Sequence, residues 1–113
     1  MLFQSLTQEV SQLEANLCSA FADPTRILIL YALNEQPRNV TELVNDLGAN
    51  QSTVSRHLKV LRDHGLVQTT RQGVCITYTL ADTRLIKALD ILRAVLHDNL
   101  TSKANLMVDE RAF

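Results

Sequence analysis

The sequence predicts a mainly α-helical fold with a small β-hairpin, in which a helix-turn-helix is followed by a two-stranded wing. Apolar residues recur at helical spacing in five segments, and the third and fourth are separated by a three-residue turn, Gly48-Ala49-Asn50. Alternating, β-rich residues then follow at Leu66–Arg71 and Val74–Leu80. The chain has 113 residues, of which 46% are hydrophobic, which suffices for one domain with a modest core.

Apolar spacing and a capping pair define the first two helices. Asp23 is a suitable N-cap and Pro24 suits the first helical position, so the second helix should begin there. Residues 27–33 are apolar almost without interruption, which predicts a central, buried helix. The first helix is amphipathic because four apolar residues recur at steps of three and four: Leu6, Val10, Leu13 and Leu17.

The third and fourth helices have matching start and stop signals. Asn39 and Glu42 are three residues apart, as in a capping box, and Gly48 ends the short third helix. Asn50 is the expected N-cap of the fourth helix, and Gly65 lies at its C-terminal cap. The apolar face of this fourth helix should be formed by Val54, Leu58 and Leu61.

The hairpin and a last helix complete the predicted domain. Gln72-Gly73 is the expected turn between the strands, and Asp82 should cap a helix whose apolar side runs through Leu96. Helical periodicity is lost from about residue 101. We therefore expect a winged helix-turn-helix domain at 1–100 and a C-terminal extension at 101–113 that frays.

The charge is unevenly distributed along the chain. The formal net charge is −1, but residues 51–72 contain four basic residues and one acidic residue. A local excess of positive charge matters more for nucleic-acid binding than the total does. The four basic residues are Arg56, Lys59, Arg62 and Arg71.

Several classes of protein find no support in the sequence. No apolar run is long enough to cross a membrane, and the N-terminus lacks the basic region of a signal peptide, so we expect a cytoplasmic protein without a membrane partner. Only three glycines are present, without a Gly-rich phosphate loop or a nucleophile–base spacing, so nothing supports an enzyme.

The start of the fourth helix has the residue types that major-groove recognition requires. Short polar side chains let the backbone approach DNA, glutamine can pair with adenine and arginine with guanine. Lys59, Arg62 and Arg71 are better placed to neutralise phosphates. For His57, a DNA contact and a helix-packing role both remain open. The predicted DNA-binding residues are Gln51, Ser52, Thr53, Ser55, Arg56, His57, Lys59, Arg62 and Arg71.

The combination of motifs resembles the ArsR/SmtB-type family of small dimeric winged-helix repressors of bacteria. The resemblance covers roughly residues 15–98 and is carried by Phe21–Leu30, Gln51–Arg62, Gly65–Val67 and the Tyr78-x-Leu80 pair. It implies a homodimer formed through the first and last helices, binding to a two-fold symmetric operator, and release on a metal, metalloid or redox signal.

The metal-binding positions of that family are not filled by strong ligands in this chain. One type of site uses cysteines around the start of the third helix, where Asn39 and Thr41 stand here. The other type uses the last helix, where the acidic positions match but Arg84 and Val95 occupy the histidine positions. We therefore expect neither a metal nor another cofactor, and a signal other than a divalent metal at these sites.

Cys18 and Cys75 are the candidate redox sensors. Cys18 could equally be a small apolar residue at a dimer interface. Strand alternation places Cys75 opposite the core-facing Ile76, so its thiol should be exposed, either reactive near Arg71 or simply tolerated at the surface. A first-helix residue and a wing residue should lie too far apart for a disulfide between them.

The sequence thus predicts a homodimeric, DNA-binding transcriptional regulator and favours a repressor. Its expected partners are double-stranded DNA, a second copy of the chain, and a small-molecule or redox inducer. The alternative is a winged helix that serves as a protein-interaction module without specific DNA binding, and only the low net charge favours it.

Overall fold

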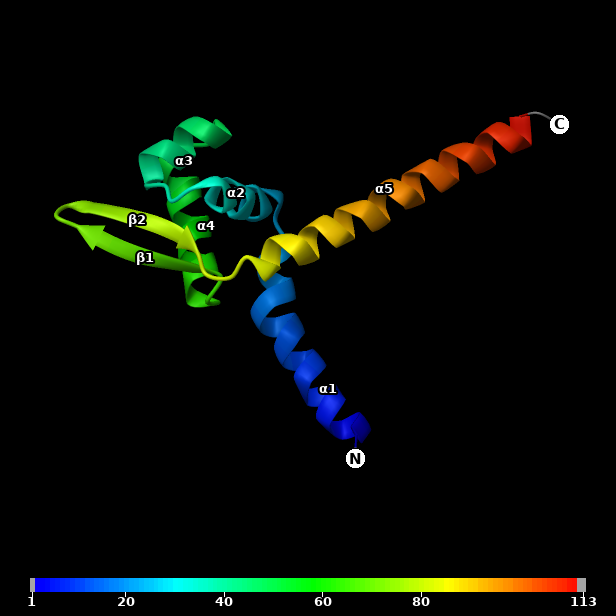
Figure 1. The fold of residues 1–113 in the computed structure, drawn as a ribbon, viewed down its shortest axis with the longest axis horizontal. Coiled ribbons are helices and arrows are strands. Elements are labelled where there is room, and N and C mark those ends of the chain that lie inside the picture. The colour runs from blue at the N-terminus through cyan, green and yellow to red at the C-terminus, as the bar shows by residue number, and fades with distance from the viewer. Residues whose placement is uncertain (1, 112–113) are drawn as a thin grey trace. The chain divides into compact units, whose positions relative to one another are not determined.

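The computed structural model describes the backbone of residues 2–111 and the side chains of residues 4–104. Five α-helices and one two-stranded antiparallel sheet are present in this part of the chain, which confirms the predicted fold class (Figure 1). The chain divides into two compact units, residues 1–83 and 84–113. The elements are α1 (Leu2–Leu13), a π-helical turn η1 (Glu14–Cys18), a 3-10 turn η2 (Ser19–Phe21), α2 (Pro24–Glu35), α3 (Val40–Leu47), α4 (Gln51–Asp63), β1 (Val67–Gln72), β2 (Cys75–Leu80) and α5 (Arg84–Arg111).

Side-chain caps set the starts of α2, α3 and α4, as the sequence predicts. The Asp23 carboxylate accepts a hydrogen bond from the backbone N–H of Thr25 at 2.8 Å. Asn39 and Glu42 exchange two reciprocal bonds of 2.9 and 3.0 Å, which complete the capping box. Asn50 caps α4 in the same way, with a 2.8 Å bond to the third helical amide. Each cap satisfies an amide that the helix itself leaves without a partner.

The first helical segment is less regular than the sequence indicates. The apolar repeat predicts one helix that extends through Leu17, but α1 ends at Leu13 and continues as η1 and then η2. A π-turn is wider than an α-turn and a 3-10 turn is tighter, so the carbonyl directions change over this stretch. Hydrophobic periodicity does not report such changes of pitch.

The core of the first unit lies between α2, α3, α4 and the base of the hairpin. Helix α2 is central, because it contacts α3, α4 and β2. Its predicted burial is only partial, since Leu28 on its outer side is exposed while Leu30 is fully buried. The buried apolar side chains of the first unit are Ala20, Ile29, Leu30, Leu33, Leu43, Val54, Leu58, Leu61, Leu66 and Val67.

The turn of the hairpin lies one residue later than predicted. Gln72 pairs with Cys75, so the two loop residues are Gly73 and Val74 rather than Gln72 and Gly73. Gly73 has a φ of 62°, the left-handed conformation that glycine adopts without steric cost. A left-handed residue at the first loop position is typical of the type II′ hairpin turn, which explains why the glycine comes first.

The hairpin extends beyond the helices that cover its base (Figure 1). Residues near its base are buried or half-buried apart from Gln68, whereas the whole stretch from Thr70 to Ile76 is exposed. The expectation that Ile76 faces the core is therefore wrong, and this side chain is 39% exposed. Val74 at the tip is 98% exposed.

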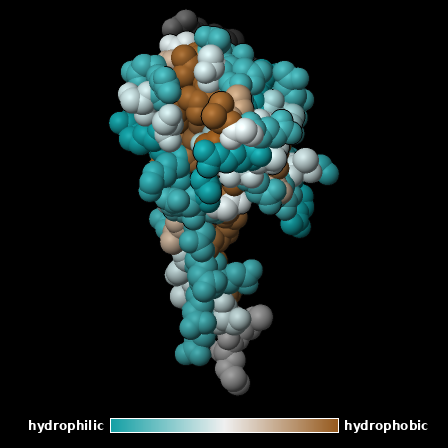
Figure 2. Space-filling view, turned by 90° about the vertical axis from the view of Figure 1, so that its left-hand side faces the viewer, coloured by the Kyte–Doolittle hydropathy of each residue, from teal (hydrophilic) through white to brown (hydrophobic). Residues whose placement is uncertain are grey.

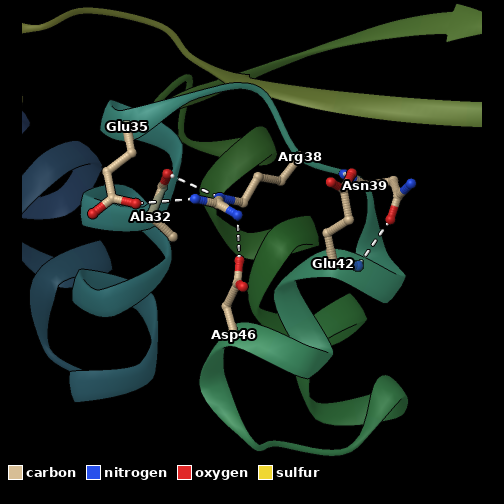
Figure 3. Close-up of polar contacts among 6 residues, drawn as sticks. All are labelled: Ala32, Glu35, Arg38, Asn39, Glu42 and Asp46. Carbon is tan, nitrogen blue, oxygen red and sulfur yellow. Dashed lines mark hydrogen bonds and ion pairs between the residues drawn. The ribbon is translucent and has the colours of Figure 1, made fainter.

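Arg38 attaches the wing to the helices. Its backbone forms a two-bond bridge with Tyr78 of β2, at 3.1 and 2.8 Å. Its guanidinium binds Asp46 of α3 at 2.7 Å, Glu35 at 3.0 Å and the carbonyl oxygen of Ala32 at 3.2 Å (Figure 3). One residue thus fixes β2 relative to the ends of two helices.

The second unit is the helix α5, which has 28 residues. Ile86 and Leu89 near its start are buried, whereas most of its later apolar side chains are exposed. Its backbone remains helical to Arg111, across the stretch where the sequence shows no helical periodicity. The division of the chain at residue 100 stays a prediction. No helix in the described part of the chain combines the length and apolar character needed to span a bilayer.

Leu30 and Leu28 of α2 differ in burial, and this difference tests where the core lies. We expect Leu30→Ala to lower the free energy of unfolding by about 2–5 kcal/mol, because it leaves a cavity in the core. Leu28→Ala, the same substitution on the same helix, should cost less than about 1 kcal/mol because Leu28 is 54% exposed. Urea denaturation measures both, and equal losses would contradict this arrangement of α2.

Candidate nucleic-acid interface

A tight turn joins α3 to α4. Gly48 ends α3 with a left-handed φ of 64°, and its N–H binds the carbonyl oxygen of Val44 at 2.9 Å. Ala49 follows, and Asn50 then caps α4. Helices α3 and α4 contact each other across this turn, so the predicted helix-turn-helix is present.

Helix α4 has one buried and one exposed face. Val54, Leu58 and Leu61 are fully buried, as the sequence predicts. The opposite face is exposed and polar or basic, and Thr53 is half-buried at its edge. The predicted DNA-binding residues that the structure brings together on this exposed face are Gln51, Ser52, Ser55, Arg56, Lys59 and Arg62.

His57 belongs to the buried side of α4. The residue is 6% exposed, and its Nδ1 lies 3.3 Å from a guanidinium nitrogen of Arg26 in α2. Its Nε2 lies 3.7 Å from the Asp23 carboxylate. A ring enclosed by α2 cannot also reach a DNA groove, so we withdraw His57 from the expected DNA contacts and assign it the helix-packing role.

Asp23 is held as a carboxylate at this junction. Burial by itself would raise its pKa, but the hydrogen bond from the Thr25 N–H and the neighbouring His57 and Arg26 together lower the pKa below the ordinary value. The sequence predicts an N-cap at Asp23 but not its junction with Arg26 and His57. The contact between Arg26 and His57 spans 31 positions, and no local pattern indicates it.

Three basic side chains are exposed away from the start of α4. Lys59 forms a 3.3 Å ion pair with Asp63, but both side chains are exposed and such pairs contribute little, so Lys59 can exchange this partner for a phosphate. Arg62 is exposed on the last turn of α4. The Nε of Arg71 donates to the carbonyl oxygen of Gly73 at 3.3 Å, which holds its guanidinium beside the wing turn.

Comparison with known proteins identifies the chain. The model of a family described as bacterial regulatory protein, arsR family, matches residues 23–69, which extend from the cap of α2 into β1. The HTH-type transcriptional regulator NmtR of Mycobacterium tuberculosis is 42% identical over 84 residues, which cover 74% of this chain and 69% of NmtR. This chain belongs to the ArsR family.

Solved structures of related proteins superpose on this ArsR-family chain and support the family assignment. The crystal structure of Rv0081 of Mycobacterium tuberculosis superposes with a TM-score of 0.74 at 34% identity, over 84% of this chain and 96% of Rv0081. The homodimeric winged helix-turn-helix DNA-binding domain of Mb0332 from Mycobacterium bovis gives a TM-score of 0.71 at 26% identity, over 83% and 86% of the two chains. The chain is thus a transcriptional regulator with a DNA-binding winged helix, and its relatives are regulators rather than enzymes.

The two cysteines of this ArsR-family chain lie on different elements. Cys18 ends the π-turn η1 and Cys75 begins β2, and both thiols are free and exposed. The predicted exposure of Cys75 is confirmed. Within the described residues, no cluster of three or more His, Cys, Asp or Glu side chains could hold a metal ion.

Cys75 borders an open cleft between the wing and the start of α3. The cleft has a volume of about 250 Å³. Figure 2 views the side of the molecule on which the wing tip lies and shows a hydrophobic patch surrounded by hydrophilic residues. The cleft is shared by the wing, which contributes Cys75, and by the start of α3, which contributes Thr41. It is lined by Asn39, Val40, Thr41, Val74, Cys75 and Ile76.

Proposed function

We propose that this ArsR-family regulator is a repressor that binds a two-fold symmetric operator as a homodimer, through the exposed face of α4 and the wing. The observation that carries this proposal is the division of α4 into two faces. Its apolar residues are buried, whereas short polar and basic side chains at its start are exposed. A recognition helix needs this arrangement, because the same helix must be anchored and must enter the major groove.

The residue types suggest separate roles along α4. Gln51 and Arg56 read base edges, since an amide can pair with adenine and a guanidinium with guanine. Ser52, Thr53 and Ser55 are short enough to let the helix backbone approach the groove. Ser52 also donates to Asn50 at 2.9 Å, which joins it to the helix cap. Lys59 and Arg62 neutralise phosphates beside the groove.

The wing makes a smaller electrostatic contribution in this proposal. Arg71 is its basic residue, and the carbonyl of Gly73 holds that side chain at the turn. Val74 stands at the fully exposed tip and adds no charge there. We therefore assign one phosphate contact per wing and no strong minor-groove contact.

Exposed apolar side chains on two helices support a homodimer. Leu6, Val10 and Leu13 of α1 are each about half exposed. Apolar side chains that repeat along one helix face and stay exposed are typical of an interaction surface. The homodimeric state of the Mb0332 domain supports the same conclusion. On α5 the exposed apolar residues are Ile91, Leu92, Val95, Leu96 and Leu100.

We propose an exposed thiol as the sensor of the releasing signal. Cys18 lies in the irregular end of the first helical segment and Cys75 in the wing, so oxidation of either would alter an element of the proposed dimer or DNA interface. With glutathione disulfide as oxidant, the cysteine thiolate attacks one sulfur, a mixed disulfide forms, and one glutathione leaves as thiolate. The family's metal positions supply no comparable ligands.

Substitution of Arg56 tests the DNA contacts. We expect Arg56→Ala to weaken operator binding by about 1–3 kcal/mol, with relaxed specificity at one base pair, because Arg56 would read a base edge. Lys59→Ala is the matched control, since loss of a phosphate contact should weaken binding to all sequences and reduce the salt slope by about 1.

Fluorescence anisotropy with a duplex from the upstream region of the gene, at several salt concentrations, measures these effects. Unchanged affinity of a folded Arg56→Ala variant would exclude Arg56 from base reading. Weak, sequence-independent binding of the wild type with little salt dependence would instead support a protein-interaction module.

A charge placed in the α1 stripe tests the dimer. We expect the wild type to sediment as a dimer at micromolar concentration. Val10→Glu should shift it toward monomer and lower operator affinity, because the added carboxylate would be buried without a partner. Gln8→Glu adds the same charge to an exposed site on the same helix and should sediment as the wild type does. A wild-type monomer at this concentration would contradict the homodimer.

Oxidation tests the thiol sensor. We expect glutathione disulfide to lower operator affinity of the wild type and reductant to restore it. Comparison of Cys18→Ser with Cys75→Ser identifies the sensor, because the variant that lacks it keeps its affinity under oxidant. If oxidised wild-type protein binds as tightly as reduced protein, the thiols are not the sensor and the inducer is a small molecule.

A further inference from the structure

One guanidinium connects the end of the first helical segment to the recognition helix. The Nε of Arg26 donates to the carbonyl oxygen of Ala20 at 2.7 Å, and its Nη2 donates to the carbonyl oxygen of Ser19 at 3.2 Å. Its Nη1 lies 3.3 Å from the Nδ1 of His57 in α4, and this nitrogen accepts from the guanidinium when the ring proton is on Nε2. Arg26 itself lies in the first turn of α2. Three elements therefore meet at one side chain.

The chemistry of this contact requires arginine. A guanidinium presents its N–H donors in a rigid planar fork, so it can serve acceptors on two elements at once, whereas a lysine ammonium is a compact point charge on a flexible stem. A neutral imidazole that accepts at Nδ1 carries its proton on Nε2. That Nε2 faces the Asp23 carboxylate, at 3.7 Å from Oδ1. The Nδ1 of the buried His57 thus faces Arg26, and its Nε2 faces Asp23.

The carbonyls that Arg26 binds belong to an irregular stretch. They follow the π-turn η1 and lie in the 3-10 turn η2. The carbonyl oxygen of Ser19 also accepts the backbone N–H of Ala22, at 3.3 Å, so Arg26 adds a second donor there. By binding the carbonyl oxygens of both Ser19 and Ala20, Arg26 ties the end of the first helical segment to α2 and α4.

We propose that Arg26 is a positioning residue for DNA binding, which acts through His57 to set the angle between α1 and α4. The inference rests on the proposed function. Two recognition helices of a dimer must enter successive major grooves about 34 Å apart. If the dimer is held in part through α1, the angle between α1 and α4 in each protomer determines this separation. Neither Arg26 nor His57 touches DNA.

Charge-conserving substitution separates positioning from electrostatics. Arg26→Lys retains the positive charge but loses the fork, so we expect about tenfold weaker binding to the upstream duplex. Binding to a scrambled duplex of the same base composition should stay within about twofold, because non-specific affinity follows charge. A residue that only stabilises the fold would change both affinities by the same factor. It would therefore leave the ratio of the affinity for the upstream duplex to that for the scrambled duplex unchanged.

Variants of His57 provide the matched pair. His57→Asn keeps an acceptor oxygen near the position of Nδ1 and should bind within about twofold of the wild type. His57→Leu removes the acceptor and should lose about tenfold in specific binding, as Arg26→Lys does. If His57→Leu fails to fold, as judged by circular dichroism, the comparison of Arg26→Lys with His57→Asn decides the matter.

Half-site spacing provides the direct test of the angle. The probes are the upstream duplex and the same duplex with one base pair inserted between its half-sites. The wild type should discriminate against the insertion, and Arg26→Lys should discriminate at least about threefold less. If Arg26→Lys has the same spacing preference and the same specific affinity as the wild type, the inference about Arg26 is overturned but the proposed function is not. Equal losses on the specific and scrambled duplexes would also overturn it, whereas a wild type without specific binding would overturn the proposed function as well.

Discussion

The arrangement of the first unit depends on the packing of the apolar face of α4 against α2. Val54, Leu58 and Leu61 are removed from water, and this burial fixes which side of α4 remains exposed. The exposed polar face is therefore a consequence of the packing rather than a separate feature. A helix that is buried on one side and solvated on the other can enter a groove without losing its anchor.

Local signals in the sequence were sufficient for most of the fold. Asp23, Asn39 and Asn50 cap their helices as predicted, because a cap depends on residues two or three positions away. The hairpin turn lies one residue later than the sequence predicts, because glycine is compatible with both positions of a two-residue loop. Ile76 is exposed rather than core-facing, because strand alternation predicts two faces but not how far a strand extends past the core.

The candidate interface could be predicted only in part. The exposed residues of α4 follow from helical periodicity, and the uneven charge distribution indicated the segment despite a net charge of −1. The sequence leaves both DNA contact and packing open for His57, because its contact with Arg26 joins residues that are distant in sequence. Long-range polar contacts of this kind leave no periodic signal, and neither does the π-turn that precedes them.

The π-turn at Glu14–Cys18 allows the first helical segment to vary in length. A π-turn holds one residue more than an α-turn, so it absorbs an insertion without rotating the helix on either side of it. The apolar stripe before it and the carbonyls of Ser19 and Ala20 after it can therefore keep their mutual orientation when the extra residue of the π-turn is lost and the turn becomes α-helical. A one-residue deletion in this turn is therefore expected to leave the attachment of α4 intact.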